Sequence, residues 1–249
     1  MIAAPGIVLL STIVAVADEC PPLAKGASGN KHVAGEWPLL KAMLITPKAN
    51  PEQFRLSTLR ANFPRDQRPR TRKNTVFKNK EDAAAAALKW VRATFGEFPV
   101  YSSLIVDDVN CLPVSGWQAK DGPCPLHHVV VLRQHWKGIP TDRHAVIYLE
   151  DTEPFSASVG FCELTPIPSS CRRLVSHATA VRAWEQVPDS TIERTIGSRP
   201  AKLHFHLSYV WSPKEYVARR EDILAPMWVY DEDERLMVDG YDGTVRFND

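Results

Sequence analysis

The alternation of apolar and polar residues between His127 and Lys137 constrains the fold more than any other feature of the sequence. Side chains that alternate with a period of two indicate a strand with one buried face. The turn residues Gly138-Ile139-Pro140 follow, and Ala145–Leu149 has the composition of a returning strand. Val100–Val109 and Phe155–Leu164 are also rich in β-branched and apolar residues, so we expect a meander of strands in the middle of the protein.

A helix is expected directly before this meander. Glu81 and Asp82 place negative charge in a first helical turn, where the helix dipole favours it. Ala83–Ala87 is a run of the best helix former, and Gly96 marks the end of the helix. The sequence contains 20 prolines, which argue against other long uninterrupted helices.

A second succession of helix and strands follows. Ser176 is a plausible N-cap for a helix over 177–186, Leu203–Trp211 alternates as a strand, and Pro226–Tyr230 is another strand. Asp242-Gly243 is a hairpin signal between Leu236–Asp239 and Thr244–Phe247. The predicted fold class is therefore α+β, a helix packed on an antiparallel sheet, and the repeated order indicates a duplicated unit. The predicted organisation is a signal peptide (1–17), an irregular basic region or linker (18–80), a first helix-plus-sheet unit (81–168) and a second one (169–249).

The N-terminal segment predicts export. Ile7–Val16 is an apolar run with the length of a signal-peptide core, and Ala15-Val16-Ala17 supplies the small residues of a cleavage site. No Lys or Arg precedes the run, which is the one departure from the usual pattern. The run is shorter than the ~20 residues that a membrane span needs. We therefore expect a product released to the periplasm or the extracellular space.

The spacing of the cysteines agrees with an oxidising compartment. Cys111 and Cys124 form one close pair, Cys162 and Cys171 form another, and Cys20 is left over. Four cysteines allow three pairings, of which 111–124 and 162–171 close the shortest loops. A cysteine metal site is the alternative, but the sequence contains no C-x-x-C spacing.

One hairpin resembles a known family. Gln134-x-Trp136-x-Gly138-Ile139-Pro140-Thr141 is similar to the Q-x-Y-x-G-I-P-V turn of PepSY and fungalysin/thermolysin-propeptide domains, and Met237–Val245 looks like their closing V-D-A-x-T-G-E-V element. The resemblance covers at most residues 81–249. It implies a cystatin-like fold, in which a sheet wraps a helix, and a non-catalytic module that acts as a propeptide, peptidase inhibitor or envelope interaction domain. Gln134, Gly138, Ile139 and Pro140 are then candidate binding residues.

Other candidate sites come from single residue types. His204 and His206 share one face of a predicted strand and could ligate zinc if a third ligand converged. Trp117 lies inside the loop between Cys111 and Cys124, where an exposed tryptophan favours a contact with a partner. Seven basic residues lie between Arg65 and Lys80, and they indicate either a solvated linker or a polyanion-binding arm. The candidate binding residues within that arm are Arg68, Arg70, Arg72 and Lys73.

The function expected from the sequence is that of an exported, non-catalytic binding module for a protein or peptide, with peptidase inhibition as its most concrete form. The sequence contains no nucleophile elbow, no H-E-x-x-H motif and no cofactor fingerprint, so no catalytic residue and no cofactor is assigned. Charge is nearly balanced, with 30 basic and 29 acidic residues, which gives no global preference for nucleic acid. Two alternatives stay open: a small secreted hydrolase or metal-dependent enzyme, and a polyanion-binding protein that uses the basic arm.

Overall fold

The structure, a computed structural model of the protein, describes residues 36–64, 80–98, 102–113, 126–150, 153–197, 205–212, 222–230 and 236–247. Of these residues 57% lie in strands and 22% in helices. The prediction of an α+β, cystatin-like and duplicated fold is wrong, because the described part of the protein is a mixed sheet of 12 strands with three α-helices. The sequence patterns do not predict two strands that unite the sheet, β1 (Glu36–Leu44) and β8 (Cys162–Arg173).

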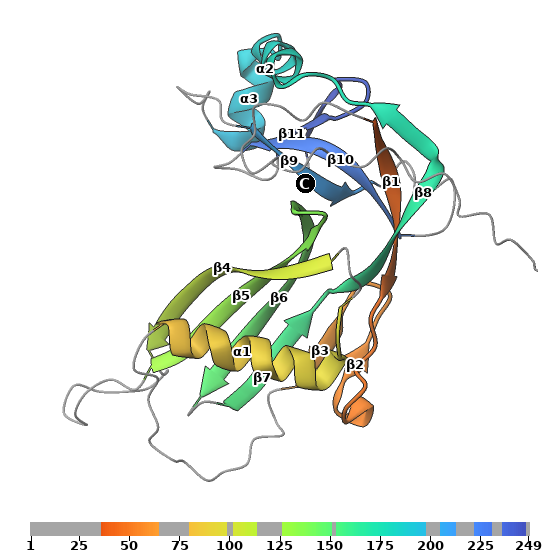
Figure 1. Cartoon of the computed structure of the whole chain (residues 1–249). Coiled ribbons are helices and arrows are strands. Elements are labelled where there is room, and N and C mark those ends of the chain that lie inside the picture. The colour runs from red at the N-terminus through yellow and green to blue at the C-terminus, as the bar shows by residue number, and fades with distance from the viewer. Residues whose placement is uncertain are drawn as a thin grey trace, which may run out of the picture.

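Six strands form the lower half of the molecule in Figure 1. In spatial order they are β4 (Ser102–Pro113), β5 (Leu126–Trp136), β6 (Ile139–Glu150), β7 (Glu153–Val159), β3 (Ala61–Phe63) and β2 (Arg55–Leu56). All neighbours in this half are antiparallel, and a short 3₁₀ helix, η1 (Pro51–Gln53), precedes β2. The predicted meander is therefore present, although all four strands begin and end at other residues than predicted.

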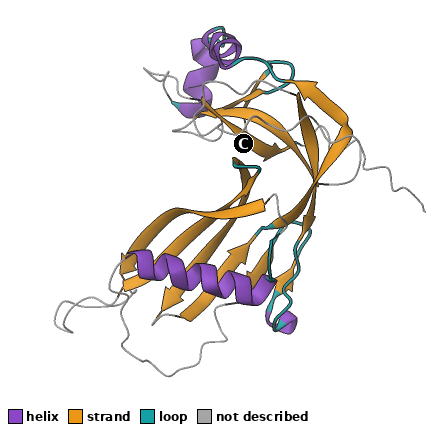
Figure 2. Ribbon diagram, in the orientation of Figure 1, coloured by secondary structure: helices purple, strands orange, loops and turns teal. Residues whose placement is uncertain are grey.

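Helix α1 (Lys80–Phe95) lies across one face of the lower half (Figures 1 and 2). Ala83, Ala87, Val91 and Phe95 recur every four residues on its buried side, and they belong to the same core cluster as the inward residues of β5, β6 and β7. Gly96 follows with a φ of +84°, a conformation that glycine adopts without strain and that ends the helix. The helix predicted from the alanine run is confirmed.

The upper half contains the other six strands and two helices. The elements not yet given are α2 (His177–Glu185), α3 (Asp189–Ile196), β9 (Phe205–Trp211), β10 (Asp222–Tyr230), β11 (Leu236–Asp239) and β12 (Val245–Phe247). Strand β10 is central: β9 runs along one edge, while β11 and β1 share the other edge at opposite ends. The predicted N-cap of α2 is confirmed, because the Ser176 hydroxyl accepts a hydrogen bond from the Thr179 N–H at 3.1 Å.

Strand β1 corrects the expectation of an irregular region before residue 81. Trp37 and Leu40 are 1% and 0% exposed, and both lie in the main core of the upper half. Strand β1 also pairs with β8, so the segment between Cys162 and Cys171 is a strand rather than a turn. The predicted boundary between residues 168 and 169 falls inside that strand.

The two halves meet where β6 runs parallel to β9, at the pair Thr141 and Tyr209. Trp136 and Ile139, which come from the lower half, are buried in the core of the upper half. The Trp136 and Tyr209 rings pack edge to face with centroids 5.4 Å apart. The β5–β6 hairpin therefore ties one half to the other.

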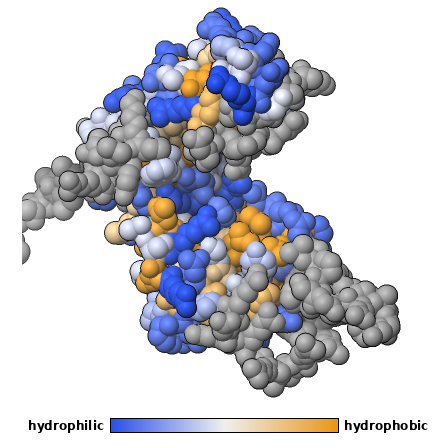
Figure 3. Space-filling view, turned by 180° about the vertical axis from the view of Figure 1, so that it is seen from behind, coloured by the Kyte–Doolittle hydropathy of each residue, from blue (hydrophilic) through white to orange (hydrophobic). Residues whose placement is uncertain are grey.

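Exposed apolar side chains lie mainly over the lower half in the view of Figure 3. Among the described residues, the large hydrophobic side chains that are exposed are Met43, Leu56, Leu59 and Ile105. They come from four different places in the sequence, and single exposed apolar side chains are normal for a folded protein. None of the helices in the described ranges combines the length and the apolar character needed to cross a membrane.

Candidate functional site

The hairpin that resembles PepSY domains lies at the joint between the halves. Gln134 and Ile139 are 0% and 7% exposed, so their side chains are packed inside the protein. Lys137 and Gly138 form the turn, with φ values of +48° and +82°. Gly138 is exposed and Pro140 is half-buried. A contact of these two residues with a partner stays a prediction.

Gln134 holds the start of β8 against β5. Its Nε2 donates to the Cys162 carbonyl at 2.7 Å and to the Ser102 hydroxyl at 3.3 Å, and its Oε1 accepts from the Cys162 N–H at 3.0 Å. The carbonyl of Gln134 accepts from the Thr141 hydroxyl at 2.8 Å. The buried amide thus satisfies backbone groups that would otherwise lie unpaired in the core.

The predicted Cys162–Cys171 disulfide is wrong. Cys162 carries a free thiol that is fully buried, whereas Cys171 is disulfide-bonded, so the two residues are not bonded to each other. Burial raises the pKa of the Cys162 thiol to about 11. A thiol with that pKa is protonated at neutral pH, so Cys162 is not an activated nucleophile. Cys124 and Cys20 lie outside the described residues, and the 111–124 pairing stays a prediction.

A charged pair, in which Arg143 is buried and Asp142 is half-buried, lies beside Cys162. Asp142 Oδ1 is 3.3 Å from Arg143 Nε, and Asp142 Oδ2 accepts a hydrogen bond from the Trp211 N–H at 2.7 Å. Burial raises the pKa of Asp142, and the opposing effects of Arg143 and of the Trp211 hydrogen bond do not cancel this shift. The pair joins β6 to β9, and its polar atoms hold strands of the two halves together.

Asp142→Asn tests the electrostatic cost of this carboxylate. A raised pKa means that the folded protein binds the Asp142 proton more tightly than the unfolded protein, whose pKa is near 3.8. The contribution of the protonated Asp142 to stability is therefore fully present below the unfolded pKa and is lost as pH rises through the folded pKa. Urea unfolding between about pH 4 and pH 7 should show wild type losing stability relative to Asp142→Asn as pH rises. If the difference in the free energy of unfolding between wild type and Asp142→Asn did not change with pH, the raised pKa of Asp142 would be contradicted.

Several predicted sites are only partly described or lie outside the described residues. His206 lies on β9, but His204 is outside the described residues, and the residues that the structure describes include no group of three His, Cys, Asp or Glu that could hold a metal ion. Trp117, the basic arm over 65–79 and the signal segment are also outside the described residues. The zinc, tryptophan, arm and export predictions therefore stay predictions.

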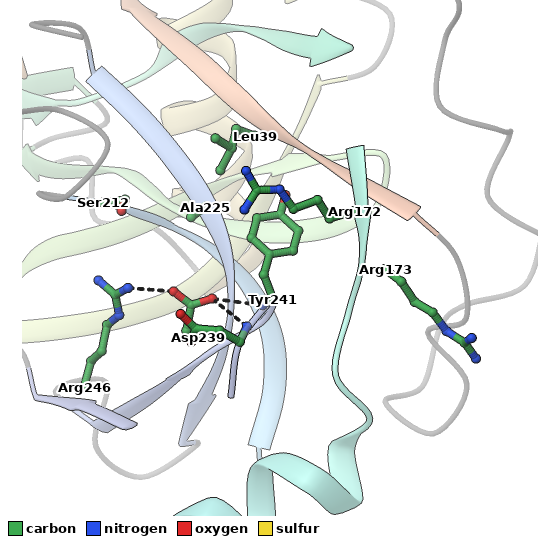
Figure 4. A pocket seen from close by; sticks show the side chains of 9 residues that line it. Leu39, Arg172, Arg173, Ser212, Ala225, Asp239, Tyr241 and Arg246 are labelled. Carbon is green, nitrogen blue, oxygen red and sulfur yellow. Dashed lines mark hydrogen bonds and ion pairs between the residues drawn. The ribbon is translucent and has the colours of Figure 1, made fainter. Parts of the chain in front are cut away.

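A pocket of about 180 Å³ lies on the upper half, where β8 meets the turn between β11 and β12 (Figure 4). Its lining residues are Leu39, Arg172, Arg173, Ser212, Ala225, Asp239, Tyr241, Asp242 and Arg246. Three arginines and two aspartates thus surround a small space, and Leu39 and Ala225 supply an apolar floor. Cationic groups are in excess, which favours a ligand with negative charge.

Asp239 organises the turn that forms one wall of the pocket. Its Oδ1 accepts the backbone N–H of Tyr241 at 2.9 Å and that of Asp242 at 3.4 Å, while Oδ2 pairs with Arg246 Nη2 at 2.7 Å. Gly243 closes the turn with a φ of +75°, as the Asp-Gly signal predicts. Both carboxylate oxygens are therefore engaged within the protein, which leaves the arginines to contact a ligand.

Two arginines present donors at the pocket. The Arg246 Nε is buried and has no hydrogen-bond partner among the described residues. Arg172 is exposed, and its guanidinium carbon lies 5.5 Å from the centroid of the Tyr241 ring. The ring is fixed in turn, because the Tyr241 hydroxyl donates to the Trp37 carbonyl at 2.8 Å. In Figure 4 the Arg173 side chain points away from the others.

Sequence patterns predict this turn but not the site. The Asp242-Gly243 signal locates the hairpin, with Tyr241 directly before it. Arg172 and Arg173 follow a cysteine in the sequence, and no periodicity connects them with Arg246 more than 70 positions later. Their proximity follows from the pairing of β8 with β1 and of β1 with β10, which no local signal specifies.

Comparison with known proteins gives no family for this protein: no family model matches it, and no curated protein is similar to it. The resemblance to PepSY and propeptide domains therefore stays a prediction. The cystatin-like fold that it implied is wrong, as described above.

Proposed function

We propose that the protein is an exported, non-catalytic binding module that holds a protein or peptide partner at the pocket of Arg172, Tyr241 and Arg246. The observation that carries the proposal is the buried Arg246 Nε, a donor without a partner among the described residues at the wall of an open pocket. A buried polar group without a partner is costly, and a ligand that supplies an acceptor recovers that cost on binding. Inhibition of an extracellular peptidase is the most concrete form of this function.

The other polar groups of the described residues support binding rather than catalysis. Asp142 and Cys162, two groups with raised pKa values, lie at the joint between the halves, where Asp142 pairs with Arg143 and accepts a hydrogen bond from the Trp211 N–H. A protonated thiol and a carboxylate held by an arginine and a backbone N–H supply neither a nucleophile nor a mobile general base. The disulfide of Cys171 supports the exported location, since disulfides persist in oxidising compartments.

Selection from a displayed library of random peptides tests the proposal. The wild-type protein should enrich a related set of peptides, and Arg172→Gln/Arg246→Gln should fail to enrich that set because both donors at the pocket are replaced. Arg92→Gln is the matched control, since it removes one positive charge from an exposed side chain on α1, in the lower half and outside the pocket lining. Equal enrichment by the double variant, or no enrichment by wild type, would refute binding at this site.

A further inference from the structure

The Arg246 guanidinium defines the position of a missing acceptor. Its Nη2 is paired with Asp239 at 2.7 Å, whereas its Nε is buried and unpaired among the described residues. Asp239 does not fill the gap, because its other oxygen accepts two backbone N–H groups of the turn. An acceptor brought by a ligand would complete the hydrogen bonds of this guanidinium, and a charged acceptor would form the stronger bond.

Arg172 offers a second set of donors. Its side chain lies against the Tyr241 ring and makes no hydrogen bond or ion pair with the side chains or backbone of the described residues. A guanidinium held over an aromatic ring keeps the N–H groups at its edge available for an anion. Figure 4 shows Arg172 and Arg246 on opposite sides of Asp239 and Tyr241. Both arginines line the pocket, so a ligand there can meet either cationic group.

The size and charge of the pocket restrict the ligand. A volume of about 180 Å³ is below the range of about 300–1,000 Å³ typical of cofactor and drug-sized sites, so the pocket suits one amino-acid side group or the end of a peptide. Asp239 and Asp242 would repel a doubly charged group more strongly than a singly charged one. Leu39, Ala225 and the Tyr241 ring provide apolar surface for a short hydrocarbon stem.

We propose that the group entering the pocket is a carboxylate of a peptide partner, bound between Arg246 Nε and the guanidinium of Arg172. This inference rests on the proposed function and names the chemistry by which that same site recognises its partner. A glutamate or aspartate side group and the C-terminus of a peptide present the same carboxylate, and small probes separate these two sources.

Nuclear magnetic resonance of the arginine Nε–H groups tests the proposal on the full-length protein. The probes are N-acetylglutamate N-methylamide, its uncharged glutamine counterpart, N-acetylalanine as a mimic of a peptide C-terminus, and inorganic phosphate. We expect the chemical shift of the Arg246 Nε–H signal to change saturably as a carboxylate probe is added. Probe concentrations up to about 50 mM are needed, because fragments of so few atoms bind weakly. The glutamine counterpart should bind at least about tenfold more weakly, since it lacks the charge.

Two variants separate the site from the rest of the surface. Arg172→Gln changes an exposed side chain that makes no hydrogen bond with the described residues, so it should fold normally and weaken binding of the carboxylate probe several-fold. Arg92→Gln, the control, should leave the affinity unchanged within about twofold, because Arg92 is exposed on α1 and lies outside the pocket lining. Stronger binding of N-acetylalanine than of the glutamate probe would identify a peptide C-terminus as the source of the carboxylate.

Three results would overturn the carboxylate assignment: equal shifts with the glutamine counterpart, tighter binding of phosphate than of either carboxylate, or no saturable shift of the Arg246 signal. These outcomes are separate from those of the peptide selection. If selected peptides bind at the pocket but carry no essential carboxylate, the proposed function holds and only this assignment fails.

Discussion

Gln134→Leu is expected to destabilise the protein by about 3 kcal/mol. Leucine has a similar volume, but it leaves the buried N–H and carbonyl of Cys162 without the partners that Gln134 supplies at 3.0 Å and 2.7 Å. Each buried polar group left unpaired costs about 1–3 kcal/mol. The affected groups lie at the start of β8, so the loss weakens the attachment of β8 to the lower half. Urea unfolding followed by circular dichroism measures the change.

Gln186→Leu provides the matched control for that variant. Gln186 follows α2 and is exposed, so the same chemical change there should alter the free energy of unfolding by no more than about 0.5 kcal/mol. If both variants changed stability by the same small amount, the role assigned to the buried amide would be wrong.

Gly240→Ala is expected to cost about 3 kcal/mol and to disturb the pocket. A Cβ at this position would overlap the carbonyl oxygen of Pro226, which is backbone and cannot rotate away, and would also press on Leu174 at 3.1 Å. The backbone of Gly240 is held on both sides, because its N–H donates to Pro226 at 3.0 Å and its carbonyl accepts from Val175 at 2.8 Å. The strand must therefore shift, which carries the cost of an overpacked core.

Gly138→Ala is a control in which the added Cβ causes backbone strain but no steric overlap. Gly138 has a φ of +82° and nothing within 4 Å of an added Cβ, so alanine there meets conformational strain alone, about 1–2 kcal/mol. Thermal or urea unfolding should thus rank Gly240→Ala as the more damaging change. The opposite order would show that β11 is not held as closely against β10 as the structure indicates.

Local signals predicted most elements of this fold. The alanine run, the Ser176 N-cap and the Asp242-Gly243 turn each act through neighbouring residues, and each is found where the sequence placed it. Strand β8 was missed because its prolines resemble turn residues. Proline is tolerated there because, among the described strands, β8 pairs with β1 alone and is therefore an edge strand.

The joint and the pocket depend on contacts between distant parts of the sequence. Tyr209 donates its hydroxyl proton to the carbonyl of Pro38 at 3.0 Å, and Tyr241 donates to Trp37, across separations of 171 and 204 positions. Patterns with periods of two or 3.6 residues contain no information on such pairings. The predicted fold class was wrong for the same reason: each helix-and-strand succession was found, but the strand that β10 and β8 share, β1, was not.

Isothermal titration of one peptide enriched by the wild-type protein tests the central claim, that the pocket of Arg172, Tyr241 and Arg246 is the partner site. Arg246→Gln should bind this peptide at least about tenfold more weakly, a loss of about 1.4 kcal/mol, while the control Arg92→Gln, outside the pocket lining, should bind it within about twofold of wild type. Circular dichroism confirms that each variant is folded before titration. Equal affinity of wild type and Arg246→Gln for the peptide would contradict the account.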